Sequence, residues 1–198
     1  MKIAIFIEPD YKLNSKILYW KNIIKKKLGN QIYLNHPPHL TLFTLEIKKK
    51  LSNKHLSEIK KLIAQHNKFD IAIKTNSVFY EDPITKGQTL YYSLKNSVKL
   101  KILQKNLLIL LANFNLNKIN KNTLKGIMKR NYIKYGYPFF GKNWIPHFTI
   151  ASVKIDKKNE MIKSFISKKT NVRFVVKKIS LWRIRNDKHL KLKSFDLL

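Results

Sequence analysis

The chain of 198 residues contains no cysteine and no long hydrophobic run. The absence of cysteine excludes disulfides, thiolate metal sites and a cysteine nucleophile. The longest apolar run, residues 107–112, is far shorter than the roughly 20 residues that a membrane-spanning helix needs. The apolar residues 3–7 are likewise too few for the core of a signal peptide. We therefore expect a cytoplasmic protein that does not contact a membrane.

Acidic residues are also scarce, since 11 of them stand against 41 lysines and arginines and leave a formal net charge of +30. Such an excess favours polyanionic partners, with nucleic acids and nucleotides first among them. An AT-rich coding bias would also raise the lysine content, so the charge has two explanations. Arginine is rare here, although its fork suits bidentate phosphate contacts better than lysine does. The stronger candidates for phosphate contacts are therefore the four arginines, Arg130, Arg173, Arg183 and Arg185.

One five-residue pattern occurs twice in the chain. Residues 38–42 read Pro-His-Leu-Thr-Leu, and residues 146–150 read Pro-His-Phe-Thr-Ile. The alternation of polar and apolar side chains predicts a strand in each case, because successive side chains of a strand point to opposite faces. The histidine and the threonine of each copy then share one face. We expect both apolar faces in the core and both polar faces at a cleft.

The order of elements after the first copy recurs after the second. Hydrophobic periodicity predicts an opening strand, helices over 15–28, 53–66 and 98–114, and strands over 31–34, 39–47, 69–74, from Ser77 and over 89–94. After the second copy come a helix containing Glu160, strands from Val172 and Ser180, and a closing strand over 192–195. The recurrence indicates an internal duplication in which the closing strands 89–94 and 192–195 match. A pseudo-two-fold axis between the repeats would place the two polar faces opposite each other in one bilobal domain, residues 1–198.

Two histidines and two threonines that face one another suit the cleavage of a phosphodiester without a metal. A neutral imidazole can accept a proton from water or a ribose hydroxyl, while a protonated one donates to the leaving oxygen. The hydroxyls would hold the phosphate oxygens as negative charge accumulates. A metal site of His36, His39 and His147 is the alternative, but the Pro37-Pro38 bend separates the first two, and no carboxylate or cysteine completes the set. We therefore expect no metal and no cofactor.

With these paired strands the chain resembles the 2H phosphoesterase superfamily, which contains the 2'-5' RNA ligase-like proteins and the cyclic phosphodiesterases. Paired His-x-[Thr/Ser]-hydrophobic strands define that superfamily. The resemblance carries its catalytic residues over onto His39, Thr41, His147 and Thr149. It implies a bilobal α+β fold with two antiparallel sheets flanking a central cleft, metal-independent action, and substrates with 2',3'-cyclic phosphates or 2'-5' linkages.

The segment 123–144, which precedes the second copy, interleaves aromatic with basic residues. Such a mixture suits base stacking combined with phosphate contact. We expect substrate contacts from Arg130, Tyr132 and Tyr135, although aromatic residues fill cores more often than binding sites. Arg183, on a predicted strand with one basic face, is a further candidate for phosphate contact.

The sequence therefore predicts a monomeric phosphodiesterase that hydrolyses a 2',3'-cyclic phosphate or a 2'-5' linkage in RNA or a nucleotide. Two alternatives stay open: a phosphodiesterase on a cyclic oligonucleotide signal or another small nucleotide, and a non-catalytic RNA-binding module on the same fold. The matched histidines argue against the module, because a pure binder has no use for an acid and a base. A long basic groove would favour RNA, and a closed pocket would favour a small nucleotide.

Overall fold

The computed structural model describes residues 1–114, 124–186 and 188–198. Its strands are β1 (Lys2–Ile7), β2 (Leu40–Glu46), β3 (Phe69–Phe79), β4 (Gln88–Leu94), β5 (His147–Val153), β6 (Arg173–Val176), β7 (Lys178–Arg185) and β8 (Lys188–Asp196). Its helices are α1 (Tyr11–Leu28), α2 (Asn53–Ala64), α3 (Val98–Ala112), α4 (Gly126–Tyr135), α5 (Glu160–Ser167) and the short 3-10 helix η1 (Gly141–Asn143). Residues 115–122, whose polar composition predicts a connector, lie outside the described residues.

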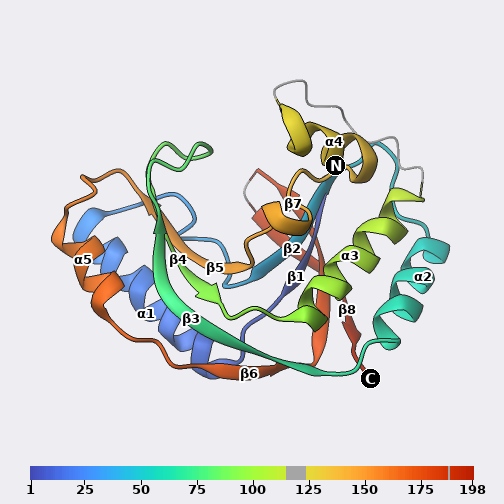
Figure 1. Cartoon of the computed structure of the whole chain (residues 1–198), viewed down its shortest axis with the longest axis horizontal. Helices are drawn as coiled ribbons and strands as arrows, with labels where there is room; N and C mark the ends of the chain where they lie inside the picture. Colours follow the sequence, from blue (N-terminus) through green and yellow to red (C-terminus); the bar gives the residue numbers. More distant parts are fainter. Residues whose placement is uncertain (115–123, 187) are drawn as a thin grey trace.

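Within the described residues the strands form one antiparallel sheet of eight, in the order β6-β3-β4-β5-β2-β1-β7-β8. Two four-stranded halves meet at β2 and β5, where the register holds a single pair, Leu40 with Phe148. Figure 1 shows α1 and α5 beside one half and α2 and α3 beside the other. The predicted α+β class with two lobes is confirmed, and the two sheets that we expected are joined into one at this seam.

The sheet order corrects the phase of the internal repeat. Counted outward from the seam, β5 matches β2, β4 matches β1, β3 matches β7, and β6 matches β8. The counterpart of β4 is therefore the opening strand β1, and not the closing strand β8 as the sequence suggested. Each repeat begins with a strand and a helix, β1 and α1 or β4 and α3, and then enters its His-x-Thr strand. Offsets along the chain could not show this phase, because the neighbours of a strand are set by non-local pairing.

Helix α1 begins at Tyr11, earlier than expected, because Asp10 caps it. The Asp10 carboxylate accepts a hydrogen bond from the N–H of Leu13 at 2.9 Å, which satisfies one of the free donors at the helix start.

In place of the two strands that we expected over 69–74 and from Ser77, the structure has the single strand β3, with a bulge between Ile73 and Thr75. A bulge turns the strand without ending it, so the polar stretch does not break the element.

The segment expected as a strand over 31–34 forms only an isolated bridge, between Ile32 and Ser152. The buried Lys21 of α1 explains this. Its ammonium group donates to the backbone carbonyls of Tyr33, Leu34 and His36. Three carbonyls that converge on one cation give a loop and not an extended strand. This loop leads directly into β2.

The apolar faces of the two motif strands are fully buried, as predicted. Leu40, Leu42, Phe148 and Ile150 each have an exposed fraction of 0%. Burial of such a side chain contributes about 1.5–3 kcal/mol relative to exposure, so these faces hold both strands firmly in the sheet.

Within the described residues no helix is long and apolar enough to cross a membrane.

Candidate active site

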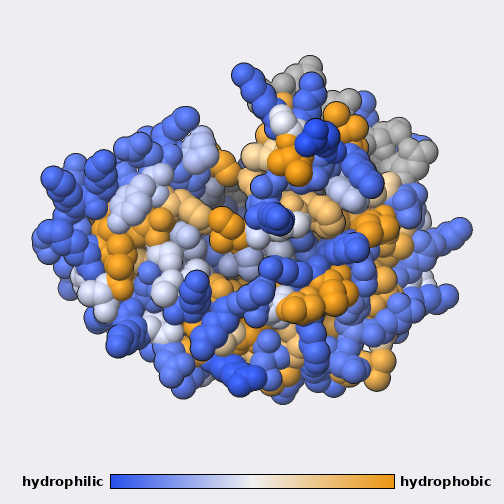
Figure 2. Space-filling model, in the orientation of Figure 1, coloured by the Kyte–Doolittle hydropathy of each residue, from blue (hydrophilic) through white to orange (hydrophobic). Residues whose placement is uncertain are grey.

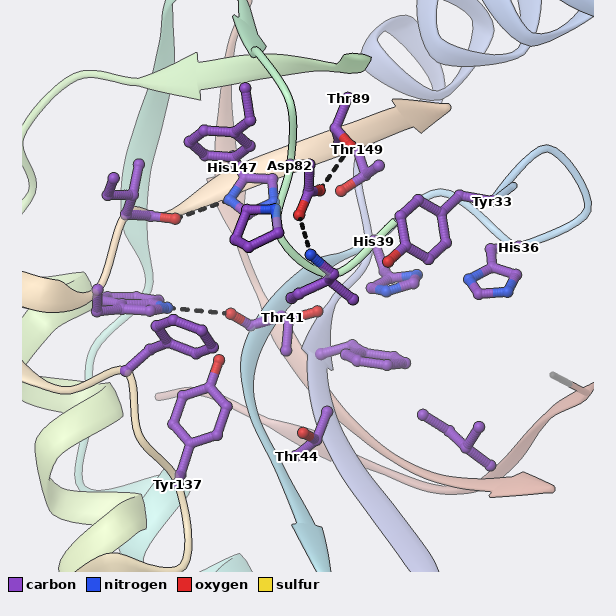
Figure 3. Close-up of a pocket in the computed structure, with 18 of the residues that line it drawn as sticks. Tyr33, His36, His39, Thr41, Thr44, Asp82, Thr89, Tyr137, His147 and Thr149 are labelled. Carbon is purple, nitrogen blue, oxygen red and sulfur yellow. Dashed lines mark hydrogen bonds between the residues drawn. The ribbon is translucent and has the colours of Figure 1, made fainter. Parts of the chain in front are cut away.

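The polar faces of β2 and β5 line one cavity of about 740 Å³ at the seam of the sheet. The side chains of His39, Thr41, His147 and Thr149 all contribute to its surface (Figure 3). The space-filling view shows a notch between the two halves of the molecule (Figure 2). The two copies of the motif therefore supply one site from the two halves of the sheet.

His39 is fixed by a backbone carbonyl and an aromatic ring. Its Nδ1 lies 2.6 Å from the carbonyl oxygen of Pro37, and its ring stacks on Phe6 with the centroids 3.8 Å apart. A carbonyl only accepts, so Nδ1 carries the proton and Nε2 remains the acceptor. Burial lowers the pKa of His39 to about 3 despite this bond, and nearby positive groups such as His189 act in the same direction. His39 is therefore neutral at neutral pH.

His147 has the same backbone contact and different neighbours. Its Nδ1 lies 2.7 Å from the carbonyl oxygen of Ile145, and the rings of Phe79 and Tyr91 lie edge-on to it at 5.3 Å and 5.1 Å. Burial lowers the pKa of His147 below its ordinary value, and the bond to Ile145 and the negative charge of Asp82 offset only part of that shift. The protonated form of His147 therefore has a counter-charge nearby.

The shared backbone contact follows from the Pro-His dipeptide. In both copies the carbonyl that meets Nδ1 belongs to the residue before a proline, Pro38 or Pro146. Proline fixes its own φ and holds the residue before it in an extended conformation. The local sequence thus presets the same tautomer in both histidines and leaves Nε2 as the unprotonated nitrogen of each neutral ring.

Besides β1, the loop before β2 and the β7–β8 hairpin, two further walls of the cavity come from segments outside the motif strands. One wall is the β3–β4 hairpin with Phe79 and Tyr80, and the other is the stretch 137–145, which contains η1. The indole N–H of Trp144 donates to the carbonyl of Thr41 at 3.3 Å and so fastens this second wall to β2. A concave, mainly apolar surface with a few converging polar groups is the usual form of a site for a small organic ligand.

The four residues expected to contact substrate, Arg130, Tyr132, Tyr135 and Arg183, do not line this cavity. Tyr132 is only 7% exposed, and the ring of Tyr135 packs against Phe140 at 4.7 Å. The segment 123–144 does supply a cavity wall, through its later part. The aromatic residues of α4 mainly fill the core, and their contact with substrate stays a prediction.

The strand register explains the place of Arg183. Ile184 pairs with His189 across β7 and β8, and both line the cavity. Arg183 pairs with Leu190 instead. Neighbouring pairs in a sheet point to opposite faces, so the side chain of Arg183 projects from the face of the sheet opposite the cavity.

Asp82 and His189 also line the cavity, although the sequence predicted other surroundings for both. The Glu-Asp-Pro stretch over 81–83 is typical of a turn, and the polar residues 186–188 before His189 favour a solvated side chain. Instead the ring of His189 lies 5.5 Å from that of His39 and 4.3 Å from that of His36. The alternation along β8 could have placed His189, but only with the register known. Among the described residues no group of three His, Cys, Asp or Glu side chains is arranged to hold a metal ion.

Comparison with known proteins gives a family model and several solved structures. The model described as "2'-5' RNA ligase superfamily" matches residues 15–188, and no curated protein matches the chain. TT0787 of Thermus thermophilus is 13% identical, with a TM-score of 0.65 over 99% of this chain and 97% of that one. E. coli LigT complexed with 3'-AMP is 13% identical, with a TM-score of 0.61 over 99% and 97%. LigT was also solved with NADP+ and with ATP. At this identity the likeness to solved structures establishes a common fold over the whole length.

Proposed function

The chain belongs to the 2'-5' RNA ligase superfamily, and on that premise we propose that it is a metal-independent phosphodiesterase with His39, Thr41, His147 and Thr149 as its catalytic residues. Membership of this family supports phosphoesterase activity in general. The finer proposal is hydrolysis of a 2',3'-cyclic phosphate or a 2'-5' linkage in RNA or a nucleotide.

One observation carries the proposal. The two histidines line the same cavity, and each is held through Nδ1 by a backbone carbonyl, which leaves both Nε2 atoms available for proton transfer. A general acid and a general base contribute about 10²–10⁴-fold each to a rate when they reach the reacting oxygens. A binding module gains nothing from two imidazoles held in this way.

The reaction uses the two histidines in opposite protonation states. The neutral imidazole takes a proton from water, whose oxygen forms a bond to phosphorus. The bond from phosphorus to a ribose oxygen breaks, and the imidazolium gives that oxygen its proton. The product is a phosphomonoester with a free ribose hydroxyl, and the two histidines have exchanged protonation states. Hydrogen bonds from Thr41 and Thr149 would stabilise the non-bridging oxygens in the transition state.

The composition of the cavity supports a nucleotide and favours a small one. Its volume of about 740 Å³ lies within the range of small-molecule sites, and its apolar walls suit a base. Among the described residues that line it, Lys2 is the only lysine or arginine. RNA bound along its backbone would call for several such side chains. The second candidate function is therefore a phosphodiesterase on a small nucleotide, such as a cyclic oligonucleotide, and LigT, which shares the fold, was solved with nucleotides.

The test is turnover in EDTA of 2',3'-cyclic mononucleotides, 2'-5' and 3'-5' oligonucleotides and cyclic dinucleotides. We expect a phosphomonoester from at least one of them, and a loss of about 10²–10⁴-fold in kcat for His39→Ala and for His147→Ala. His55→Ala, a histidine outside the cavity, is the matched control and should keep full activity. Full inhibition by EDTA would overturn the absence of a metal, and full activity of the double variant would overturn the mechanism.

A further inference from the structure

A buried carboxylate in the cavity wall is unexplained by the catalytic motif. Asp82 follows β3 in the β3–β4 hairpin, is only 8% exposed, and is the sole acid among the described residues that line the cavity. The chain carries 11 acidic residues in total. Burial of a carboxylate is expensive unless it is hydrogen-bonded and meets a cation, so its position calls for a reason.

The hairpin holds this carboxylate in one place. Oδ2 accepts a hydrogen bond from the hydroxyl of Thr89 at 2.6 Å, and Oδ1 accepts one from the N–H of Ile84 at 2.9 Å. The hairpin packs closely against β5. A Cβ on Gly87 would lie only 2.8 Å from the carbonyl oxygen of Val153, so the backbone of the hairpin approaches β5 where only glycine fits. The carboxylate is therefore fixed relative to β5, which begins with His147.

The two histidines of the site face different charges. His147 faces Asp82 from the hairpin (Figure 3) and the neutral ring of Tyr91 from β4. His39 faces groups that are cationic or become so on protonation, namely Lys21 from α1, His36 from the preceding loop and His189 from β8. Lys2 from β1 lines the same cavity. A positive charge is therefore opposed at His39 and supported at His147.

We propose that Asp82 is a positioning residue that favours the imidazolium form of His147 over that of His39, so that His147 gives the proton to the leaving oxygen while His39 takes the proton from the attacking water. This assignment rests on the proposed hydrolysis for its chemistry. The electrostatic part, a carboxylate that stabilises the charge of His147 and leaves His39 alone, is independent of any substrate.

The electrostatic part is tested by NMR titration of the histidine rings in Asp82→Asn. Asparagine keeps the shape of the side chain and can still accept from Ile84, so the variant removes mainly the charge. We expect the titration midpoint of His147 to fall and that of His39 to stay where it is. Glu81→Gln removes a charge from the same hairpin at an exposed position outside the cavity and should move neither midpoint. An unchanged His147 midpoint in Asp82→Asn would overturn the proposal.

The wild-type protein provides a second reading if Asp82→Asn does not fold. The side-chain carbon signal of Asp82 should show a step at the midpoint of His147 and none at that of His39, because close charges titrate as a pair. A step at the His39 midpoint, or no step at all, would contradict the proposed pairing.

The catalytic part is tested by the pH profile of kcat/KM on whichever substrate is turned over. We expect the alkaline limb of the bell to move to lower pH in Asp82→Asn, with a loss of roughly tenfold at about pH 8 that shrinks as the pH is lowered. Asp82→Asn should add nothing in a His147→Ala background and keep its effect in a His39→Ala background. A uniform loss at every pH would reduce Asp82 to a structural role. No turnover by the wild-type protein would overturn the proposed function and leave the NMR result standing.

Discussion

Strands β2 and β5 carry the same five-residue pattern and the same backbone contact, yet their histidines lie in opposite electrostatic surroundings. His39 stacks on Phe6 among groups that disfavour a second positive charge. His147 lies near the buried carboxylate of Asp82. The pattern itself sets the tautomer, and neighbours from distant parts of the chain set the charge. A duplicated motif can thus give two different groups, as acid–base catalysis requires.

The threonines test how far the likeness between the copies extends, and apart from the histidine variants we expect the largest effects there. Thr41→Val and Thr149→Val keep the shape of the side chain and remove the hydroxyl. Each should lower kcat by about 10²-fold, the usual loss when one donor to a developing oxyanion is removed. Thr41→Ser and Thr149→Ser keep the hydroxyl and should retain most of the activity.

The readout is kcat for both Val variants and both Ser variants at one pH. Similar losses in the two Val variants would mean that the copies share the phosphate oxygens equally. A loss confined to one strand would show that the asymmetry of the histidines extends to the hydroxyls. Full activity of both Val variants would contradict a role for either threonine.

Lys21 distinguishes the two strands in a different way, since it supports only the approach to β2. Lys21→Met removes the cation from three backbone carbonyls, those of Tyr33, Leu34 and His36. Buried acceptors that lose their partner cost about 1–3 kcal/mol, and we expect the free energy of unfolding to fall by that amount in urea titrations. NMR signals of His39 should shift, and those of His147 should not.

Lys25→Met is the matched control, because Lys25 lies one turn further along α1 with its side chain exposed. It should leave both stability and the His39 signals unchanged. Equal shifts at His39 and His147 in Lys21→Met would contradict the idea that the two approaches are independent.

Local pattern was enough to predict the motif strands and their buried faces, because alternation is a property of a few consecutive residues. The repeat of this pattern also predicted that His39, Thr41, His147 and Thr149 face one cleft, and all four line the same cavity. The phase of the repeat, the place of Asp82 in the cavity and the particular residues of the segment 123–144 that line it could not be predicted. Each depends on which strands pair and in which register, and that information is non-local.

The remaining effect that we expect concerns stability at low pH. The folded pKa of His39 is about 3, below its ordinary value of 6.5. Between these values the unfolded chain binds a proton that the folded chain does not. The contribution of His39 to the free energy of unfolding is therefore fully present above about pH 6.5. It is lost as the pH falls, by at most about 1.4 kcal/mol per pH unit.

Urea titrations between about pH 4 and about pH 7 should show that the free energy of unfolding depends less steeply on pH in His39→Gln than in the wild-type protein. His147→Gln should change the slope less, because Asp82 favours the protonated form of His147 in the folded state. Equal changes in the two variants would mean that the fold does not distinguish the two copies of the motif.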